Sequence, residues 1–167
     1  AWSADLTPAT DKRGEVSGGG LAFGSGQVFA TTGYGELVAL DATSGAIQWR
    51  QRFDTGVGGA PTVDGGVVYA AARDVSAWAL RANDGKVLWQ VDGGAAKSGV
   101  TGGSSPAING TQVVFPFATG QLLSVDRETG SPVWQAFVAG ARPGRAYARV
   151  SDLSGDPVVA DGVIYAG

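Results

Sequence analysis

Three residue types are missing from this sequence of 167 residues, which contains no cysteine, no histidine and no methionine. The absence of cysteine excludes a disulfide framework, a thiolate metal site and a cysteine nucleophile. The absence of histidine excludes a Ser-His-Asp triad and removes the usual protein ligands of zinc and haem. No apolar run approaches the roughly 18–20 residues that a transmembrane helix needs. We therefore expect no catalytic residue, no metal and no cofactor.

Charge is also sparse, and its balance is slightly negative. Lys and Arg together number 12 while Asp and Glu number 15, which gives a net charge of −3. No broad basic field exists to attract a polyanion, so nucleic acid is not an expected partner. Glycine, in contrast, is abundant at 28 residues. It is scattered between short apolar runs, as the many tight turns of an all-β protein require.

The chain contains an internal repeat. Residues 38–49, 78–89 and 123–134 align without gaps, and each runs from an apolar strand end through a polar turn to a tryptophan. A glycine stands four residues before each of these tryptophans, which are 40 and 45 residues apart. The glycines are Gly45, Gly85 and Gly130, and the tryptophans are Trp49, Trp89 and Trp134. A period of this length is typical of repeat architectures.

Each unit holds four short β-type runs separated by turns rich in Gly, Asn and Asp. In the second unit we expect strands near residues 60–63, 67–72, 76–81 and 87–91. Four strands in about 40–45 residues are the dimensions of a propeller blade. We predict an all-β fold, a single partial β-propeller over residues 1–167 with about three complete four-stranded antiparallel blades and parts of two others. The expected blades are residues 17–54, 58–93 and 103–139 and the start of another at 155–167, with inter-blade loops at 94–103 and 140–154.

The recurring tryptophan has a structural explanation. A single blade buries little surface, so its faces must pack on neighbouring blades. Tryptophan offers a large flat apolar ring and one N–H that needs an acceptor, and both are available on an adjoining blade. Trp2 is interpreted as the closing tryptophan of a preceding unit. Trp78 lies outside this pattern, on an expected third strand where the sister units have Val38 and Leu123, and core packing is its expected role.

The repeated pattern Ala-x-Asp-x-x-Thr/Ser-Gly-x-x-x-Trp, met by residues 39–49 and closely by 124–134, resembles the tryptophan-docking motif of the PQQ-type eight-bladed propellers. Residues 144–159 look like a characteristic loop and strand of the BamB family, the propeller lipoproteins of the outer-membrane β-barrel assembly machinery. Residues 17–29 and 33–40 look like the versions found in α-proteobacterial members. The resemblance covers the whole chain, which amounts to about half of an eight-bladed ring.

The resemblance implies a scaffold that binds the periplasmic POTRA domains of BamA through two adjacent inter-blade loops. The first loop matches residues 98–106 and places Val100 and Thr101 at the contact. The second matches residues 149–154, where Asp152 is the first aspartate of the family's Asp-x-Asp and Ser154 replaces the second. The resemblance also implies a periplasmic location at the inner face of the outer membrane, a lipid anchor outside this chain, and nascent outer-membrane proteins as further partners.

The second loop also has an unusual composition. Three of the nine arginines, Arg142, Arg145 and Arg149, fall within eight residues, with Tyr147 between them. Arginine and tyrosine commonly anchor protein interfaces. We therefore predict Arg145, Tyr147 and Arg149 as partner-binding residues, together with Asp152, which the resemblance implies; the alternative is an ordinary solvated loop.

Other functions remain as alternatives. The PQQ-type superfamily includes quinoprotein dehydrogenases, which need a calcium-bound quinone and a carboxylate base near the substrate. The sequence shows no convergent group of acidic and amide side chains for such a site, and we expect the protein not to be an enzyme. A propeller that binds unfolded peptides by β-augmentation is a third hypothesis. Residues 93–103 are rich in glycine but lack the Gly-Lys-Ser/Thr ending of a phosphate loop. Asp41, Asp84 and Asp126 lie at repeated turns, where local backbone hydrogen bonding explains them better than calcium does.

Overall fold

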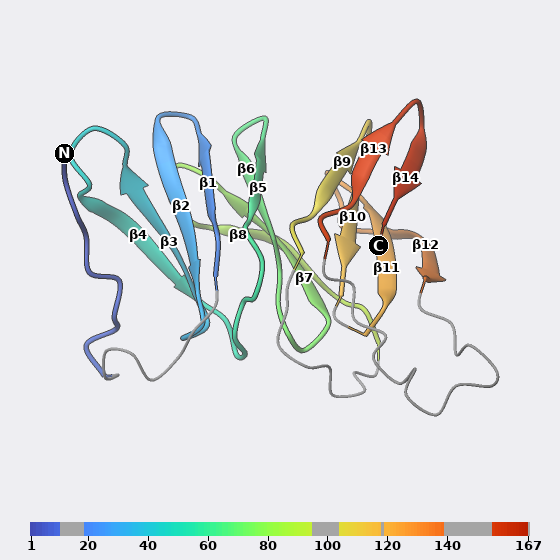
Figure 1. The fold of residues 1–167 in the computed structure, drawn as a ribbon, viewed down its shortest axis with the longest axis horizontal. Helices are drawn as coiled ribbons and strands as arrows, with labels where there is room; N and C mark the ends of the chain where they lie inside the picture. Colours follow the sequence, from blue (N-terminus) through green and yellow to red (C-terminus); the bar gives the residue numbers. More distant parts are fainter. Residues whose placement is uncertain (11–18, 95–103, 118, 139–154, 167) are drawn as a thin grey trace.

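The computed structural model describes residues 1–10, 19–94, 104–117, 119–138 and 155–166, and their regular structure consists entirely of β-strands (Figure 1). The strands are β1 (Leu21–Gly24), β2 (Gln27–Thr32), β3 (Glu36–Asp41), β4 (Ile47–Arg52), β5 (Thr62–Asp64), β6 (Val67–Ala71), β7 (Ser76–Arg81), β8 (Val87–Asp92), β9 (Ala107–Asn109), β10 (Gln112–Pro116), β11 (Gln121–Asp126), β12 (Pro132–Phe137), β13 (Val158–Ala160) and β14 (Val163–Tyr165). Within these ranges no helix is long and apolar enough to cross a membrane.

The strands form three four-stranded sheets and one two-stranded sheet, each paired in chain order. We call β1–β4 the first blade, β5–β8 the second and β9–β12 the third. The strands of each sheet pair in antiparallel fashion. This up-and-down arrangement confirms the predicted fold class of four-stranded antiparallel blades. In the second blade the strands begin and end within two residues of the predicted bounds.

The same irregularity occurs in all three blades. The register between the third and fourth strands shifts between Ala39 and Leu40, between Ala79 and Leu80, and between Ser124 and Val125. Such a bulge gives the fourth strand one extra residue and increases its local twist. It comes immediately before the repeated tryptophan, so it helps to set the direction in which the indole points.

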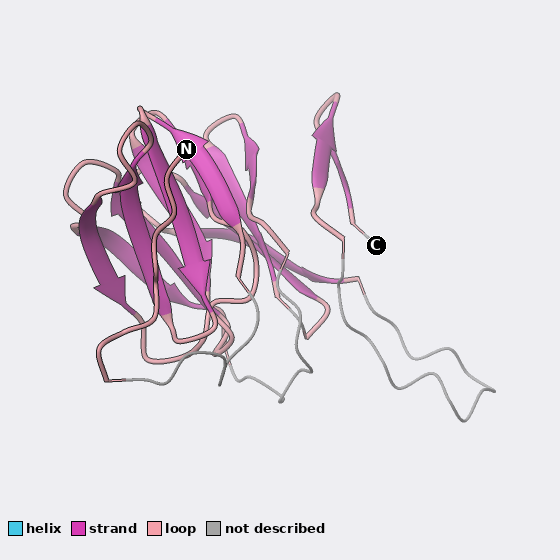
Figure 2. Ribbon diagram, turned by 60° about the vertical axis from the view of Figure 1, so that its left-hand side comes forward, coloured by secondary structure: helices cyan, strands magenta, loops and turns pink. Residues whose placement is uncertain are grey.

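The blades lie side by side, face to face (Figures 1 and 2). The third strands β3, β7 and β11 are buried almost throughout, since both of their faces are covered. One apolar core fills the seam between the first and second blades and includes Phe29, Leu37 and Leu80. Another fills the seam between the second and third blades and includes Tyr69 and Phe115. Burial of these seams is the main source of stability, because an isolated blade has little core of its own.

Candidate functional site

Each seam carries a tryptophan from one blade docked on the next. The indole of Trp49 donates its Nε1–H to the carbonyl oxygen of Ala82 at 2.8 Å. Trp89 donates in the same way to Arg127 O at 3.1 Å. Ala82 and Arg127 both begin the turn between the third and fourth strands of the following blade, so every docking step joins consecutive repeats.

A glycine receives each docked ring. At Gly85 a Cβ atom would lie 2.6 Å from Cε3 of Trp49, and at Gly130 it would lie 2.8 Å from Cδ2 of Trp89. Both glycines have positive φ, +71° and +73°, which side-chain-bearing residues rarely adopt. Glycine is therefore required at this position for two reasons: the turn needs positive φ, and the indole approaches too closely for a Cβ atom.

The segment before the first blade docks in the same manner. Trp2 donates its Nε1–H to Ala42 O at 3.0 Å, and its ring lies where a Cβ of Gly45 would be. Four residues later Leu6 packs against the first blade's buried face. Trp2 thus has the docking contacts that Trp49 and Trp89 have on their following blades.

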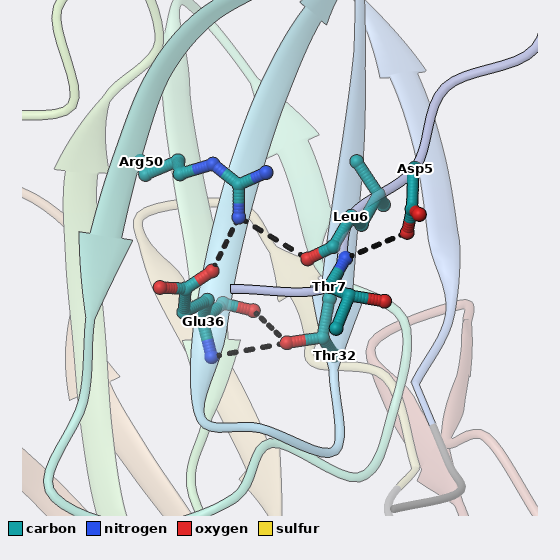
Figure 3. Close-up of polar contacts among 6 residues, drawn as sticks. All are labelled: Asp5, Leu6, Thr7, Thr32, Glu36 and Arg50. Atoms are coloured by element: carbon teal, nitrogen blue, oxygen red, sulfur yellow. Dashed lines mark hydrogen bonds and ion pairs between the residues drawn. The ribbon is translucent and has the colours of Figure 1, made fainter. Parts of the chain in front are cut away.

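A second contact fixes this segment (Figure 3). Arg50 donates from Nη1 both to the carboxylate of Glu36 at 2.6 Å and to the carbonyl oxygen of Leu6 at 3.2 Å. Glu36 is only 7% exposed, so its charge needs this partner. Thr32 closes the adjacent turn by bonding the backbone of Glu36. These polar contacts do not repeat in the other described blades and have no signal in the repeat pattern.

The fourth repeated tryptophan is held differently. Trp134 donates its Nε1–H to Gln112 Oε1 of its own blade at 3.2 Å. Its ring packs against Val114 and Leu122, and Ile164 packs against the same cluster. Ile164 belongs to β14, so the two-stranded sheet covers part of the third blade's far face.

Asp41 and Asp126, in the repeated turns, accept hydrogen bonds from nearby backbone amides. Asp41 Oδ1 accepts hydrogen bonds from Ser44 Oγ and the amides of Thr43 and Ser44. These bonds, the hydroxyl of Ser44 first, lower the pKa of Asp41 because they stabilise the charged form. Asp126 is bonded in the same pattern by Thr129 and Glu128, and its pKa is lowered for the same reason.

The second blade has Arg81 at the repeat position of these aspartates. Arg81 pairs instead with Asp84, at 3.0 Å. Among the described residues no group of three or more His, Cys, Asp or Glu side chains is arranged to hold a metal ion.

The predicted partner-binding residues all lie outside the described part of the chain; they are Val100, Thr101, Arg145, Tyr147, Arg149 and Asp152. The structure does describe the points at which their loops join the sheets. In an up-and-down blade, the fourth strand ends and the next first strand begins at the end that carries the turn between the second and third strands. We call this the connector end. Both predicted loops therefore join the blades at the connector end.

The two loops return to the sheets at neighbouring points. Ser105, just before β9, donates its backbone N–H to Asp156 Oδ1, just before β13, at 2.6 Å. Strands β9 and β13 are also in contact. The hydrogen bond spans 51 residues of sequence, and it brings together the residues that follow the two loops.

Another group at the connector end was not predicted from the sequence. The turn between β6 and β7 contains Arg73, Asp74 and Val75, and both Arg73 and Asp74 are exposed. Val75 has φ +67°, whereas the corresponding residues of the other blades are glycines, Gly35 and Gly120. The unusual turn could have been found from the sequence, because a gapless alignment of the three units places the β-branched Val75 where both sister units have glycine.

Three similarities place the chain among known proteins. BamB from Yersinia pestis, named outer membrane protein assembly factor, is 27% identical over 170 residues that cover 99% of this chain and 43% of that protein. The crystal structure of BamB from Moraxella catarrhalis superimposes with a TM-score of 0.70 at 27% identity, covering 88% of this chain and 42% of that one. The dehydrogenase subunit of a quinone alcohol dehydrogenase from Gluconobacter oxydans is 30% identical over 129 residues, which are 72% of this chain and 17% of that protein.

The chain thus spans less than half the length of the BamB proteins it resembles. A family model described as "Outer membrane protein assembly factor BamB" matches residues 1–167, the full extent of the sequence. The repeated docking geometry, the blade topology and this match agree, and the chain belongs to the BamB family of PQQ-like propeller proteins.

Proposed function

We propose that the protein is a non-catalytic scaffold subunit of the machinery that assembles β-barrel proteins in the outer membrane. The observation that carries this proposal is the match of the whole sequence to the BamB family model. We place the protein in the periplasm, at the inner face of the outer membrane, held there by a lipid anchor outside this chain. Its proposed direct partner is a BamA-like barrel assembly protein, with nascent outer-membrane proteins as a further class of partner.

The proposed binding surface is the connector end, and its core is formed by the loops that carry Val100, Thr101, Arg145, Tyr147, Arg149 and Asp152. The hydrogen bond from Ser105 to Asp156 supports this choice, because it holds the return points of the two loops together. Loops on a rigid sheet scaffold commonly carry binding residues. Arginine and tyrosine in the second loop supply the side chains that most often dominate binding energy.

The test is a binding titration between the purified protein and the periplasmic POTRA domains of BamA from the same bacterium. Charge reversal by Arg149→Glu or Asp152→Lys should weaken binding by about tenfold or more, since it replaces an attractive contact with a repulsive one. Lys86→Glu is the matched control, because Lys86 lies in a turn at the opposite end of the second blade. Circular dichroism checks that each variant keeps its fold.

Two results would contradict this proposal in different ways. Failure of the parent protein to bind the POTRA domains removes the proposed partner. Binding by the Arg149 and Asp152 variants that equals the parent's would leave the partner in place but exclude this assignment of the surface.

A second candidate function is a PQQ-dependent dehydrogenase. It is favoured by the 30% identity to the Gluconobacter oxydans quinone alcohol dehydrogenase subunit. The purified protein is mixed with PQQ and calcium, and quinone absorbance and dye-linked alcohol oxidation are measured. Activity above that of PQQ and calcium alone would favour the dehydrogenase and overturn the scaffold proposal.

A further inference from the structure

The turn between β6 and β7 differs physically from its two counterparts. All three turns have positive φ at the residue before the third strand, namely +79° at Gly35, +67° at Val75 and +78° at Gly120. A β-branched residue in this region is a rare outlier, because the left-handed backbone is strained for an L-residue. Strain of this kind persists only where surrounding contacts impose it, and such positions cluster at functional sites.

A chain of polar contacts holds the turn in this conformation. Trp78 donates its Nε1–H to Ser76 Oγ at 2.7 Å, and Ser76 Oγ in turn donates to Asp74 Oδ1 at 2.6 Å. The amide of Ser76 also donates to Asp74 Oδ1, at 3.1 Å. Ser76 and Trp78 are buried, and Phe53 meets the Trp78 ring edge-on at 4.9 Å. The tryptophan outside the repeated pattern therefore supports this turn.

The turn is also fastened to the connectors on both sides of the second blade. On one side, the amides of Arg73 and Asp74 donate to Gly56 O at 3.0 Å and to Thr55 Oγ1 at 3.3 Å. On the other side, Val75 O accepts from the amide of Gly93 at 2.8 Å. Gly93 begins the loop that carries Val100 and Thr101, so the strained turn fixes the starting point of a predicted partner-binding loop.

The turn between β6 and β7 exposes the guanidinium of Arg73 to solvent. Arg73 is exposed, and its side chain passes over Gly56, where an added Cβ would lie 3.4 Å from Arg73 Cδ and Nε. Neither Arg73 nor Arg52, which ends β4, has an ion pair within the described residues, whereas Arg50, Arg81 and Arg127 each pair with a carboxylate. The nearest acid in sequence, Asp74, directs its Oδ1 to Ser76.

We propose that Arg73 is a further partner-binding residue, held by the strained turn so that its guanidinium contacts a carboxylate on the partner protein. This inference rests on the proposed function and extends its surface to the turn between β6 and β7, which is bonded to Gly56 of the β4–β5 connector and to Gly93. A guanidinium binds a carboxylate through two parallel N–H donors, which a preorganised backbone favours because less freedom is lost on binding.

The test compares three variants in the POTRA-domain titration described above. Arg73→Glu should weaken binding by about tenfold, and Arg73→Lys should weaken it by a smaller factor because it keeps the charge but loses the paired donors. Lys86→Glu makes the same change of charge at the opposite end of the blade and should bind as the parent does. Added salt should weaken binding of the parent more steeply than binding of Arg73→Glu, and this result would support an ion pair between Arg73 and the partner's carboxylate.

The outcomes separate the inference from the function on which it rests. If the parent binds and Arg73→Glu binds equally well, Arg73 is excluded from the surface while the proposed function stands. If Arg73→Glu and Lys86→Glu weaken binding equally, the effect is one of net charge and the inference is wrong. If the parent does not bind, the proposed function and the inference both fail.

Discussion

Replacement of Gly85 by alanine is the sharpest test of the docked seams. The left-handed backbone at φ +71° costs alanine about 1–2 kcal/mol. In addition, the new Cβ would lie 2.6 Å from Cε3 of Trp49, well inside the roughly 3.5–4.0 Å of an ordinary carbon contact. The indole must therefore move outward by about 1 Å.

The displaced ring loses two stabilising contacts. Its 2.8 Å hydrogen bond to Ala82 O lengthens or breaks, which costs about 1 kcal/mol. Part of its packing against the seam is lost as well, and full removal of a buried tryptophan sets an upper limit of about 5 kcal/mol. We expect Gly85→Ala to destabilise the protein by about 3 kcal/mol in total, which is the sum of the strain and these partial losses.

Gly66→Ala is the matched control for backbone strain. Gly66 lies in the same blade with φ +78°, and nothing lies within 4 Å of its added Cβ. Its substitution should cost only the conformational term of about 1–2 kcal/mol. Urea unfolding followed by circular dichroism measures both variants; at about 2 kcal/mol per molar urea, Gly85→Ala should lower the midpoint by about 1.5 M.

A double-mutant cycle isolates the contact itself. In a Trp49→Ala background the ring is absent, so Gly85→Ala should cost no more than Gly66→Ala does. The coupling energy between positions 49 and 85 should then exceed about 1 kcal/mol. Equal costs for Gly85→Ala and Gly66→Ala in the parent background would refute the claim that the ring closely contacts this glycine.

Three further substitutions test other features. Asp126→Asn removes a carboxylate whose pKa is lowered in the folded protein. The stability that this carboxylate contributes should be present above the ordinary aspartate pKa of 3.8 and should disappear as pH falls through the lower native pKa. The melting temperatures of parent and variant should therefore differ at pH 7 and converge in acid, and a difference that stays constant with pH would contradict this account. Val75→Gly should change stability by less than about 1 kcal/mol, because loss of a buried side chain is offset by relief of strain; a urea-derived loss near 3 kcal/mol would show that the turn is unstrained. Arg127→Met breaks the ion pair to the half-exposed Asp64 across the second seam, and should lower stability by less than about 1 kcal/mol while reducing its dependence on salt.

Much of the fold was predictable because the stabilising contacts repeat. The spacing of glycine to tryptophan recurs in every unit, and each recurrence satisfies the same physical need for a docked ring and a tight turn. The expected strands of the second unit match β5–β8 within two residues for this reason. Contacts that occur once among the described residues left no such pattern, as shown by Arg50 with Glu36 and by Trp78 with Ser76.

The candidate site was less predictable, for a related reason. Loops between blades are not constrained by the core, so their lengths and residues differ from unit to unit and no internal comparison assigns their roles. The predicted contact residues came from the family resemblance and from the Arg- and Tyr-rich composition of the second loop, and they lie outside the described part of the chain. Val75 is the exception, because a valine aligned with two glycines marks an unusual turn in the amino-acid sequence itself.

The direction of docking has a consequence for synthesis. Trp2, Trp49 and Trp89 are each made before the glycine turn that receives them, because each contacts a turn of the next repeat. During translation each newly emerged blade therefore keeps an unsheltered indole until the ribosome has added about forty more residues, a delay of several seconds at ordinary elongation rates. A holdase that recognises exposed aromatic rings would meet the growing chain once per blade, at the last blade completed.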